Sequence, residues 1–374
     1  MKRNSNFELM RLVSMFFIVV WHIIMHGHVI ENCTNPAIKI LLEMIMFIII
    51  VHVNSFVLLS GYFQSKSKFK LSKFLKIFLQ VIFYSLAILI LSIKLGWLKD
   101  YNIVIFINNG LLSSLNNYWF IKMYLVTYVF SDYINKFIDR LSRGEYKNFL
   151  IISFIVLSII PFLTGNNVVY NDGYSIINFM FLYIIGGYLR RYPLKKTYHF
   201  KRMSTNGYRT LLIFGFISLA LINYLIHHFS LEINGMSNIF TEISSRIKYT
   251  NTWYSTPFVI LQTILYFEFF KTLDFKNKLV NKLSATAFGI YLIHDNELIR
   301  NHLYKILRID TGPFSTYKIF PKIILVALII FIICIIIELI RQLLEKGVGK
   351  LKISKLLIEK FKNFINSFNF KINW

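Results

Sequence analysis

Residues 9–30, LMRLVSMFFIVVWHIIMHGHVI, form an apolar run near the start of the chain. A helix rises about 1.5 Å per residue, so about 20 residues cross the roughly 30 Å of hydrocarbon in a bilayer. The run is too long for the apolar part of a signal peptide, and no small-residue cleavage pattern follows it. It therefore predicts a first transmembrane helix that stays in the protein, preceded by the basic residues Lys2 and Arg3.

The composition extends this interpretation to the whole chain. Of its 374 residues, 56% are hydrophobic, 17% aromatic and only 16% charged, whereas a soluble domain carries about 25% charged residues. The net charge of +24 does not indicate a nucleic-acid-binding protein, because Lys and Arg occur in short groups between apolar runs. Cys33 and Cys334 lie far apart, without a Cys or His at zinc spacing, so we expect neither a disulfide nor a structural metal.

Ten apolar runs of membrane-spanning character follow one another along the chain. They are residues 9–30, 37–63, 74–93, 119–133, 149–164, 176–189, 211–229, 253–270, 284–303 and 319–340, of which the fourth and sixth are short. No linker rich in Pro, Gly or Ser separates a soluble domain. The predicted fold class is therefore all-α, a polytopic transmembrane helical bundle of about ten spans.

The distribution of positive charge orients this bundle. With a cytoplasmic N-terminus, the cytoplasmic segments hold 30 Lys and Arg residues and the opposite side holds nine, as the positive-inside rule requires. Both termini are then cytoplasmic. We expect an integral membrane domain over residues 1–345 and a basic amphipathic cytoplasmic tail over residues 346–374, lying on the anionic inner leaflet.

Ionisable side chains inside a span are costly, so each is a candidate for function. Arg11 and His22 are eleven positions apart, which places them on one stripe of the first helix, about 16 Å from each other. Glu8 and His26 extend the stripe. The alternatives are an Arg11 that extends to the headgroups and a His22 that makes a structural hydrogen bond between helices.

The sequence does not predict a metal site in the spans. His22 and His26 could share a metal, but a third ligand is needed, and the candidates on the second run, Glu43 and His52, are nine positions apart and so on opposite faces of a helix.

A second polar group, His294, Asp295 and Arg300, interrupts the ninth run and is either a structural pairing or part of a catalytic site. A neutral imidazole can accept a proton as a general base, and Arg11 can pair with a phosphate of a cytoplasmic donor. These residue types fit an enzyme that acts across the membrane. They also fit a transporter with a proton relay or a non-catalytic scaffold.

Four segments together resemble the integral-membrane acyltransferase 3 family, which includes O-acetyltransferases of bacterial surface polysaccharides. Arg11 and His22 carry the family's spacing of Arg, ten residues and His. The segment 53–63, VNSFVLLSGYF, is similar to the family's Ser-Gly-Tyr segment. The remaining segments are 118–121, YWFI, with Tyr124, and the late pair 183–188, YIIGGY, and 288–294, FGIYLIH.

The resemblance implies roles for particular residues. It implies a catalytic His22 supported by Arg11, and donor binding by Arg11 and by the segment that starts at Ser60 and Gly61. Gly61 has two readings, close helix packing or room for a ligand, and Ser60 is either a hydrogen bond at a helix end or a substrate contact. Candidate substrate-site residues are Glu8, His26, Trp119, Tyr124 and His294.

The sequence departs from the family in the loop after Gly61. Where many members carry Arg-x-x-Arg, this chain has Lys73 and Lys76, which the resemblance makes candidate donor-binding residues. They keep the charge but lose the bidentate geometry of arginine.

The resulting expectation is a membrane-bound O-acyltransferase, in particular an O-acetyltransferase, of the multi-pass type in a bacterial cell membrane. It would move an acyl group from cytoplasmic acetyl-CoA to a sugar hydroxyl of a cell-surface or exported glycan, without a metal. Its partners would be acyl-CoA, the glycan or lipid-linked sugar and membrane lipid, with no nucleic acid. The alternative is a transporter or flippase for a lipid-linked glycan.

Overall fold

The computed structural model describes residues 4–99, 104, 118–164, 173–232 and 254–348. Helices account for the regular structure of these residues, and no strand occurs among them. The elements are α1 (Ser5–His26), α2 (Pro36–Ile49), α3 (His52–Gln64), α4 (Leu71–Lys94), α6 (Trp119–Arg140), α7 (Arg143–Phe154), the π-helix η2 (Ile155–Ile159), α8 (Ile160–Thr164), α9 (Ile176–Arg191), η4 (Leu194–Lys196), α10 (Tyr198–Lys201), α11 (Thr205–Glu232), α13 (Pro257–Thr272), α14 (Lys278–Ser284), α15 (Ala287–His294), α16 (Glu297–Ile306) and α17 (Ile319–Val348). The predicted all-helical fold is confirmed for the described residues.

Among the described residues, six helical segments are long and apolar enough to cross a membrane: residues 5–26, 36–64, 71–94, 143–164, 205–228 and 319–347. They coincide with the first, second, third, fifth, seventh and tenth predicted runs. The fourth run corresponds to α6, which extends past the apolar part of the run to Arg140 and carries several charges. The sixth and eighth correspond to α9 and α13, each of 16 residues. The tail predicted over residues 346–374 lies almost wholly outside the described residues.

The ninth run, predicted as one span over residues 284–303, is wrong as a single helix. The chain instead forms α14, α15 and α16, with breaks after Ser284 and His294. At the second break the Asn296 side chain accepts a hydrogen bond from the backbone N–H of Leu298, at 3.1 Å, and so caps α16. Hydropathy counts apolar residues and does not detect such caps.

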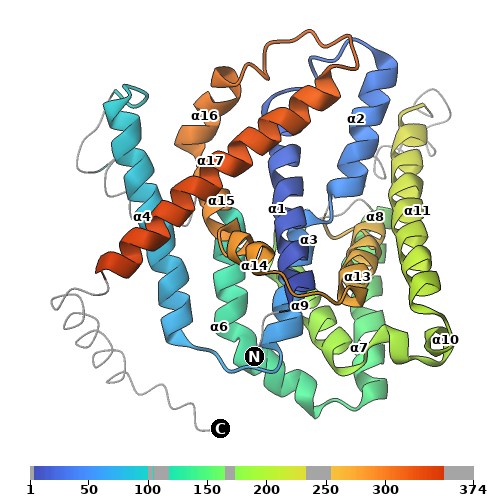
Figure 1. Cartoon of the computed structure of the whole chain (residues 1–374). Helices are drawn as coiled ribbons and strands as arrows, with labels where there is room; N and C mark the ends of the chain where they lie inside the picture. Colours follow the sequence, from blue (N-terminus) through green and yellow to red (C-terminus); the bar gives the residue numbers. More distant parts are fainter. Residues whose placement is uncertain (1–3, 100–103, 105–117, 165–172, 233–253, 349–374) are drawn as a thin grey trace.

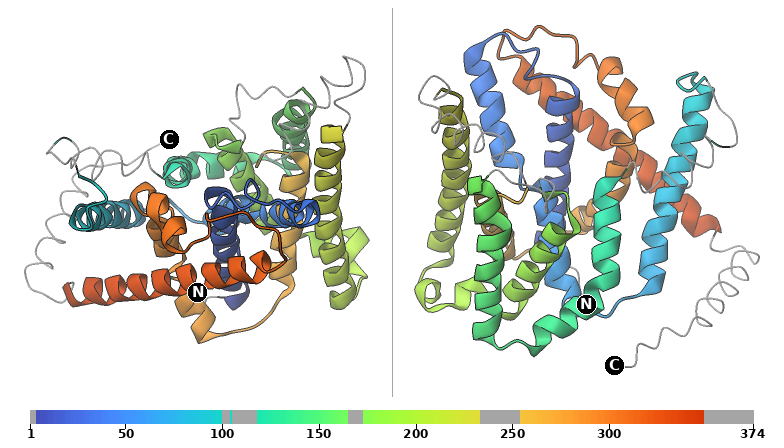
Figure 2. Two further views of the ribbon diagram at one scale, coloured as in Figure 1. Left: turned by 90° about the horizontal axis from the view of Figure 1, so that it is seen from above. Right: turned by 180° about the vertical axis from the view of Figure 1, so that it is seen from behind.

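Helix α1 lies in the middle of the bundle, with α4 and α11 at opposite edges (Figure 1). Seen from above, α17 lies on one side of α1 and α6, α7 and α9 lie on the other (Figure 2). One buried apolar cluster surrounds the later part of α1, from Met15 to Ile24, and a second includes Phe7 and Met10 from its first turns. The central position of α1 places its polar stripe inside the protein.

Helices α3 and α9 cross in close contact. A Cβ on Gly61 would lie 2.1 Å from the carbonyl oxygen of Tyr183, and one on Gly186 would lie 2.2 Å from that of Leu58. Only glycine permits this approach of two backbones. Of the two readings of Gly61, the structure therefore shows close helix packing.

Candidate active site

A cavity of about 530 Å³ follows α1 through the interior. Its α1 wall is a single helical stripe formed by Arg11, Met15, Ile18, Trp21, His22, Met25 and His26. The other walls come from α3, α4, α6, α14, α15 and α16, and from Tyr174 and Tyr254, which precede α9 and α13. Lys73 and Ser284 line it together with Arg11, and Asp295 and Arg300 line it together with His22. One continuous space therefore joins the two polar residues of the first-helix motif.

Hydrogen bonds assign the proton positions on two histidines. Nδ1 of His294 lies 2.6 Å from the carbonyl oxygen of Ile290. Because a carbonyl only accepts, this nitrogen carries the hydrogen, and Nε2 of the neutral ring is an acceptor. That Nε2 lies 3.1 Å from Nδ1 of His22, which must therefore donate. The lone pair of His22 is then on Nε2, the atom available to accept a proton.

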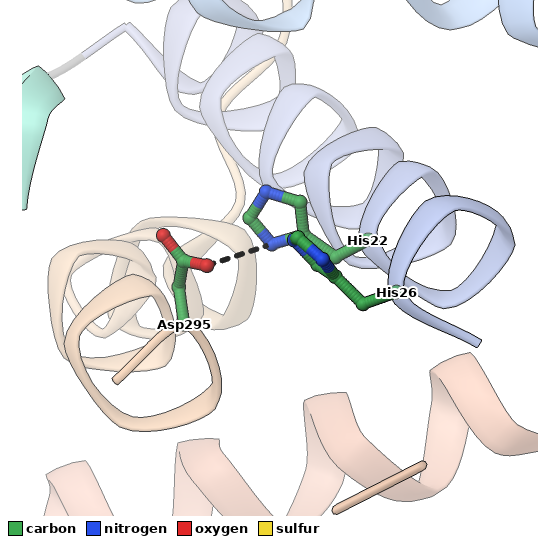
Figure 3. Close-up of side chains that lie close together, drawn as sticks. All are labelled: His22, His26 and Asp295. Atoms are coloured by element: carbon green, nitrogen blue, oxygen red, sulfur yellow. Dashed lines mark ion pairs between the residues drawn. The ribbon is translucent and has the colours of Figure 1, made fainter. Parts of the chain in front are cut away.

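Asp295 supplies negative charge beside His22. Its Oδ1 lies 3.5 Å from Nδ1 of His22, a distance suited to an ion pair once the imidazole is protonated (Figure 3). Arg300 donates to the same oxygen at 3.1 Å and holds the carboxylate in place. The sequence marked Asp295 and Arg300 as a polar group without assigning them to the site. The only signal was their position at the end of the apolar segment 288–294.

Arg11 is anchored at the other end of the stripe. Its Nη1 donates to both carboxylate oxygens of Glu8, at 2.8 and 2.9 Å, and the Ser284 hydroxyl donates to Glu8 as well. The Arg11 side chain is 34% exposed and faces the cavity, whereas Glu8 is buried behind it. Glu8, predicted as a substrate-site residue, therefore holds Arg11 and does not line the cavity.

A comparison with known protein families identifies the family of the chain. The model of the acyltransferase 3 family, described as an acyltransferase domain, matches residues 4–339. The chain belongs to the acyltransferase 3 family. The protein is therefore an acyltransferase, and the resemblance drawn from the first-helix motif is confirmed. No curated protein and no solved structure matches the chain.

In this acyltransferase the two lysines after Gly61 lie in different environments. Lys73 lines the cavity, and its Nζ donates to Oε1 of Gln64 at 3.4 Å. The side chain of Lys76 is 68% exposed and lies 3.7 Å from a carboxylate oxygen of Glu345, away from the cavity lining. Of the lysine pair predicted for donor binding, the structure brings only Lys73 to the cavity.

Of the adjacent residues Ser60 and Gly61, only Ser60 lines the cavity. The Ser60 hydroxyl donates to the carbonyl of Phe56 at 2.9 Å, within α3, and its side chain also lines the cavity. Both readings of Ser60 therefore remain compatible with its position. Gly61, packed against α9, is not part of the lining.

Aromatic residues form much of the remaining wall. Trp119 and Tyr124, both predicted as substrate-site residues, line the cavity from the start of α6. The Trp119 ring lies 4.3 Å from that of Tyr174, centroid to centroid. His52, considered from the sequence only as a metal ligand, also lines the cavity, with the Tyr254 hydroxyl 3.3 Å from its Nε2. These side chains give the cavity apolar faces with a few polar groups, as in small-molecule sites generally.

Three of the cavity residues carry metal-ligand atoms near one another. One ligand atom each from His22, His26 and Asp295 lies within 4.8 Å of the other two (Figure 3). Asp295, the third residue of this group, comes from the ninth predicted run, whereas the candidate third ligands from the sequence, Glu43 and His52, lie in the second. Arg300, 3.1 Å from Asp295, competes with a cation for that carboxylate.

Proposed function

We propose that this acyltransferase moves an acyl group, acetyl in particular, from cytoplasmic acetyl-CoA to a sugar hydroxyl of a cell-surface or exported glycan. The observation that carries the proposal is the single cavity shared by Arg11, Lys73 and His22. Cations at one end suit the phosphates of a donor. A histidine further along the same cavity suits general base catalysis at the acyl group.

The proposed topology accounts for the direction of transfer. Both termini lie in the cytoplasm, and residues 1–345 form one membrane domain of about ten passages. Besides the six apolar helical segments, the passages are α6, α9, α13 and the broken passage α14–α16. The excess of Lys and Arg on the side of Arg11 and Lys73 supports the placement of the donor there. We further propose that the segment 346–374 lies on the inner leaflet of a bacterial cell membrane.

The reaction needs one proton acceptor. Nε2 of His22 takes the proton of the acceptor hydroxyl while the oxygen forms a bond to the thioester carbonyl carbon. As the carbon–sulfur bond breaks, the CoA thiolate leaves and takes the proton back from the His22 imidazolium. Asp295, 3.5 Å from Nδ1 of His22, stabilises the imidazolium between these two transfers, as a carboxylate does in other histidine-based sites. A route through an acyl-imidazole uses the same nitrogen as the nucleophile.

Arg11 orients the donor in this scheme. Glu8 occupies its Nη1 through two hydrogen bonds, so the guanidinium meets a phosphate with its remaining N–H groups. Lys73 adds a second cation from α4. The acceptor is surrounded by three residues of the cavity lining, His26, Trp119 and Tyr124. His294 acts on it indirectly, through its hydrogen bond with His22.

The test is to purify the surface glycan from cells that express wild-type protein, His22→Ala or Arg11→Ala at matched protein levels. Ester-linked acetate per sugar is measured by release with mild base. The proposal predicts acetate near background for His22→Ala and a strong reduction for Arg11→Ala. Unchanged acetate in His22→Ala rules out the catalytic role, and normal acetate per sugar with failed glycan export indicates a transporter instead.

A further inference from the structure

The segment of residues 64–70, made of the last residue of α3 and the connection to α4, is held at its backbone by one face of α6. Tyr128, Asp132, Asn135 and Asp139 are spaced by four, three and four residues, which places them on one stripe of the helix. All four bind this segment directly or through one further residue.

The hydrogen bonds cover most of the segment. Asn135 donates from Nδ2 to the carbonyls of Gln64 and Ser67, at 3.1 and 3.2 Å. The backbone N–H of Phe69 donates to Oδ1 of Asp132 at 2.7 Å, and that of Lys70 donates to the Tyr128 hydroxyl at 3.0 Å.

Helix α9 also holds Asn135 and residues 64–70 in place. The Tyr183 hydroxyl of α9 donates to Oδ1 of Asn135 at 3.0 Å, so the amide cannot turn over without losing a bond. Asn135 is only 8% exposed. Arg191, also of α9, donates to the Ser65 carbonyl at 3.1 Å and to Asp139.

The segment held in this way and the first turns of α4 are together strongly basic. Lys66, Lys68, Lys70, Lys73 and Lys76 lie within eleven residues, and mutual repulsion opposes a fixed conformation of such a chain. Gln64 connects the fixed backbone to Lys73, since its Oε1 accepts from Nζ of Lys73 at 3.4 Å. The Tyr128 ring lies 4.8 Å from the same Nζ. Lys73 is the lysine of this group that lines the cavity.

We propose that Asn135 and Tyr128 are positioning residues for donor binding: they fix residues 64–70 so that Lys73 is presented to the donor phosphates. The inference rests on the proposed use of Lys73 in binding acetyl-CoA. It adds that the basic segment is preorganised by α6, which lowers the conformational entropy lost when the donor binds.

The experiment measures binding of acetyl-CoA to the full chain in lipid nanodiscs by titration calorimetry, and release of free CoA by membranes that contain the native acceptor. Asn135→Leu removes three hydrogen bonds, and Tyr128→Phe is the milder variant, which removes the hydroxyl but keeps the ring. Thr127→Val is the matched control, because the Thr127 hydroxyl bonds only to the Met123 carbonyl of its own helix in the described structure, at 2.8 Å.

We expect acetyl-CoA binding to weaken about tenfold for Asn135→Leu and about threefold for Tyr128→Phe. The factors differ because the first variant loses three hydrogen bonds and the second loses only those of the hydroxyl. KM for acetyl-CoA should rise by the same factors at constant kcat, and Thr127→Val should match wild type. In a Lys73→Ala background the additional effect of either variant should fall below about twofold, because both act through Lys73.

The outcomes separate this inference from the proposed function. Wild-type binding by Tyr128→Phe and Asn135→Leu overturns the positioning role, as does an equal loss with and without Lys73. If Lys73→Ala itself binds acetyl-CoA like wild type, the donor assignment of Lys73 fails, and the positioning role fails with it. A weakened Lys73→Ala beside an unaffected Asn135→Leu leaves the proposed function intact and removes only the inference.

Discussion

Nε2 of His294 accepts the hydrogen that His22 carries on Nδ1, across 3.1 Å and 272 positions of sequence. The Ile290 carbonyl fixes the His294 ring from the other side, at 2.6 Å from Nδ1. A backbone group of α15 thereby decides which nitrogen of a side chain on α1 is free to react. In the proposed mechanism, His294 thus orients the histidine that accepts the proton.

The first prediction concerns this orientation. His294→Ala should lower kcat for acetyl transfer about 100-fold at nearly constant KM for acetyl-CoA, because positioned proton transfer contributes about 100-fold to 10,000-fold. His294→Gln keeps an acceptor and should recover part of the rate. CoA release by membranes is the measurement, with His302→Ala as a matched histidine control outside the cavity lining. A His294→Ala enzyme with wild-type kcat would contradict the orienting role.

The second prediction concerns the charge beside His22. Asp295→Asn keeps the size of the side chain but removes the charge that stabilises the imidazolium, so kcat should fall at least tenfold while acetyl-CoA affinity stays constant. The control is Glu297→Gln, an exposed acid two residues away. Equal losses in both variants would indicate a general electrostatic effect rather than the contact at 3.5 Å.

The third prediction separates packing from ligand binding at Gly61. Gly61→Ala places a Cβ 2.1 Å from the Tyr183 carbonyl, and separating α3 from α9 should cost about 1–3 kcal/mol of stability or more. Thermal unfolding in detergent should show a lowered Tm. Gly144→Ala in α7, where a Cβ meets nothing within 4 Å, should leave the Tm unchanged or slightly higher. Normal stability together with weakened acetyl-CoA binding would favour the ligand reading.

The fourth prediction is a pH dependence at the C-terminal end of α6. Burial raises the pKa of Asp139, but hydrogen bonds and charge from Arg191 and Lys66 outweigh it and hold the pKa below its ordinary value of 3.8. A carboxylate with a lowered pKa stabilises the fold above its unfolded pKa and loses this contribution as the pH falls through the folded pKa.

Because the Asp139 side chain is 48% exposed, the contribution should be about 1 kcal/mol or less. Asp139→Asn should therefore lower the Tm slightly at pH 7, and the difference from wild type should shrink as the pH falls below 3.8 and vanish below the folded pKa. The Tm of both proteins across this pH range is the measurement. A difference that grows toward acid pH would show that the sign is wrong.

Sequence alone determined the first helix and its polar stripe. The spacing of Arg11 and His22 fixes their relative direction, because helix periodicity is a local property. Apolar length predicted the six segments that are long enough to cross a membrane, and the motifs of the first helix and the Ser-Gly-Tyr segment identified the family. These features depend on residues near one another in the chain.

Only the tertiary structure decided what meets His22. The breaks around α15 bring His294 and Asp295 to α1 from the other end of the chain. Hydropathy does not reveal such helix breaks, because they depend on capping side chains and turns. The role of Gly61 likewise depends on the path of α9, and that of Asn135 on the placement of a loop beside α6. Such contacts follow from how helix surfaces fit together over long sequence separations, which the residue pattern of one segment does not specify.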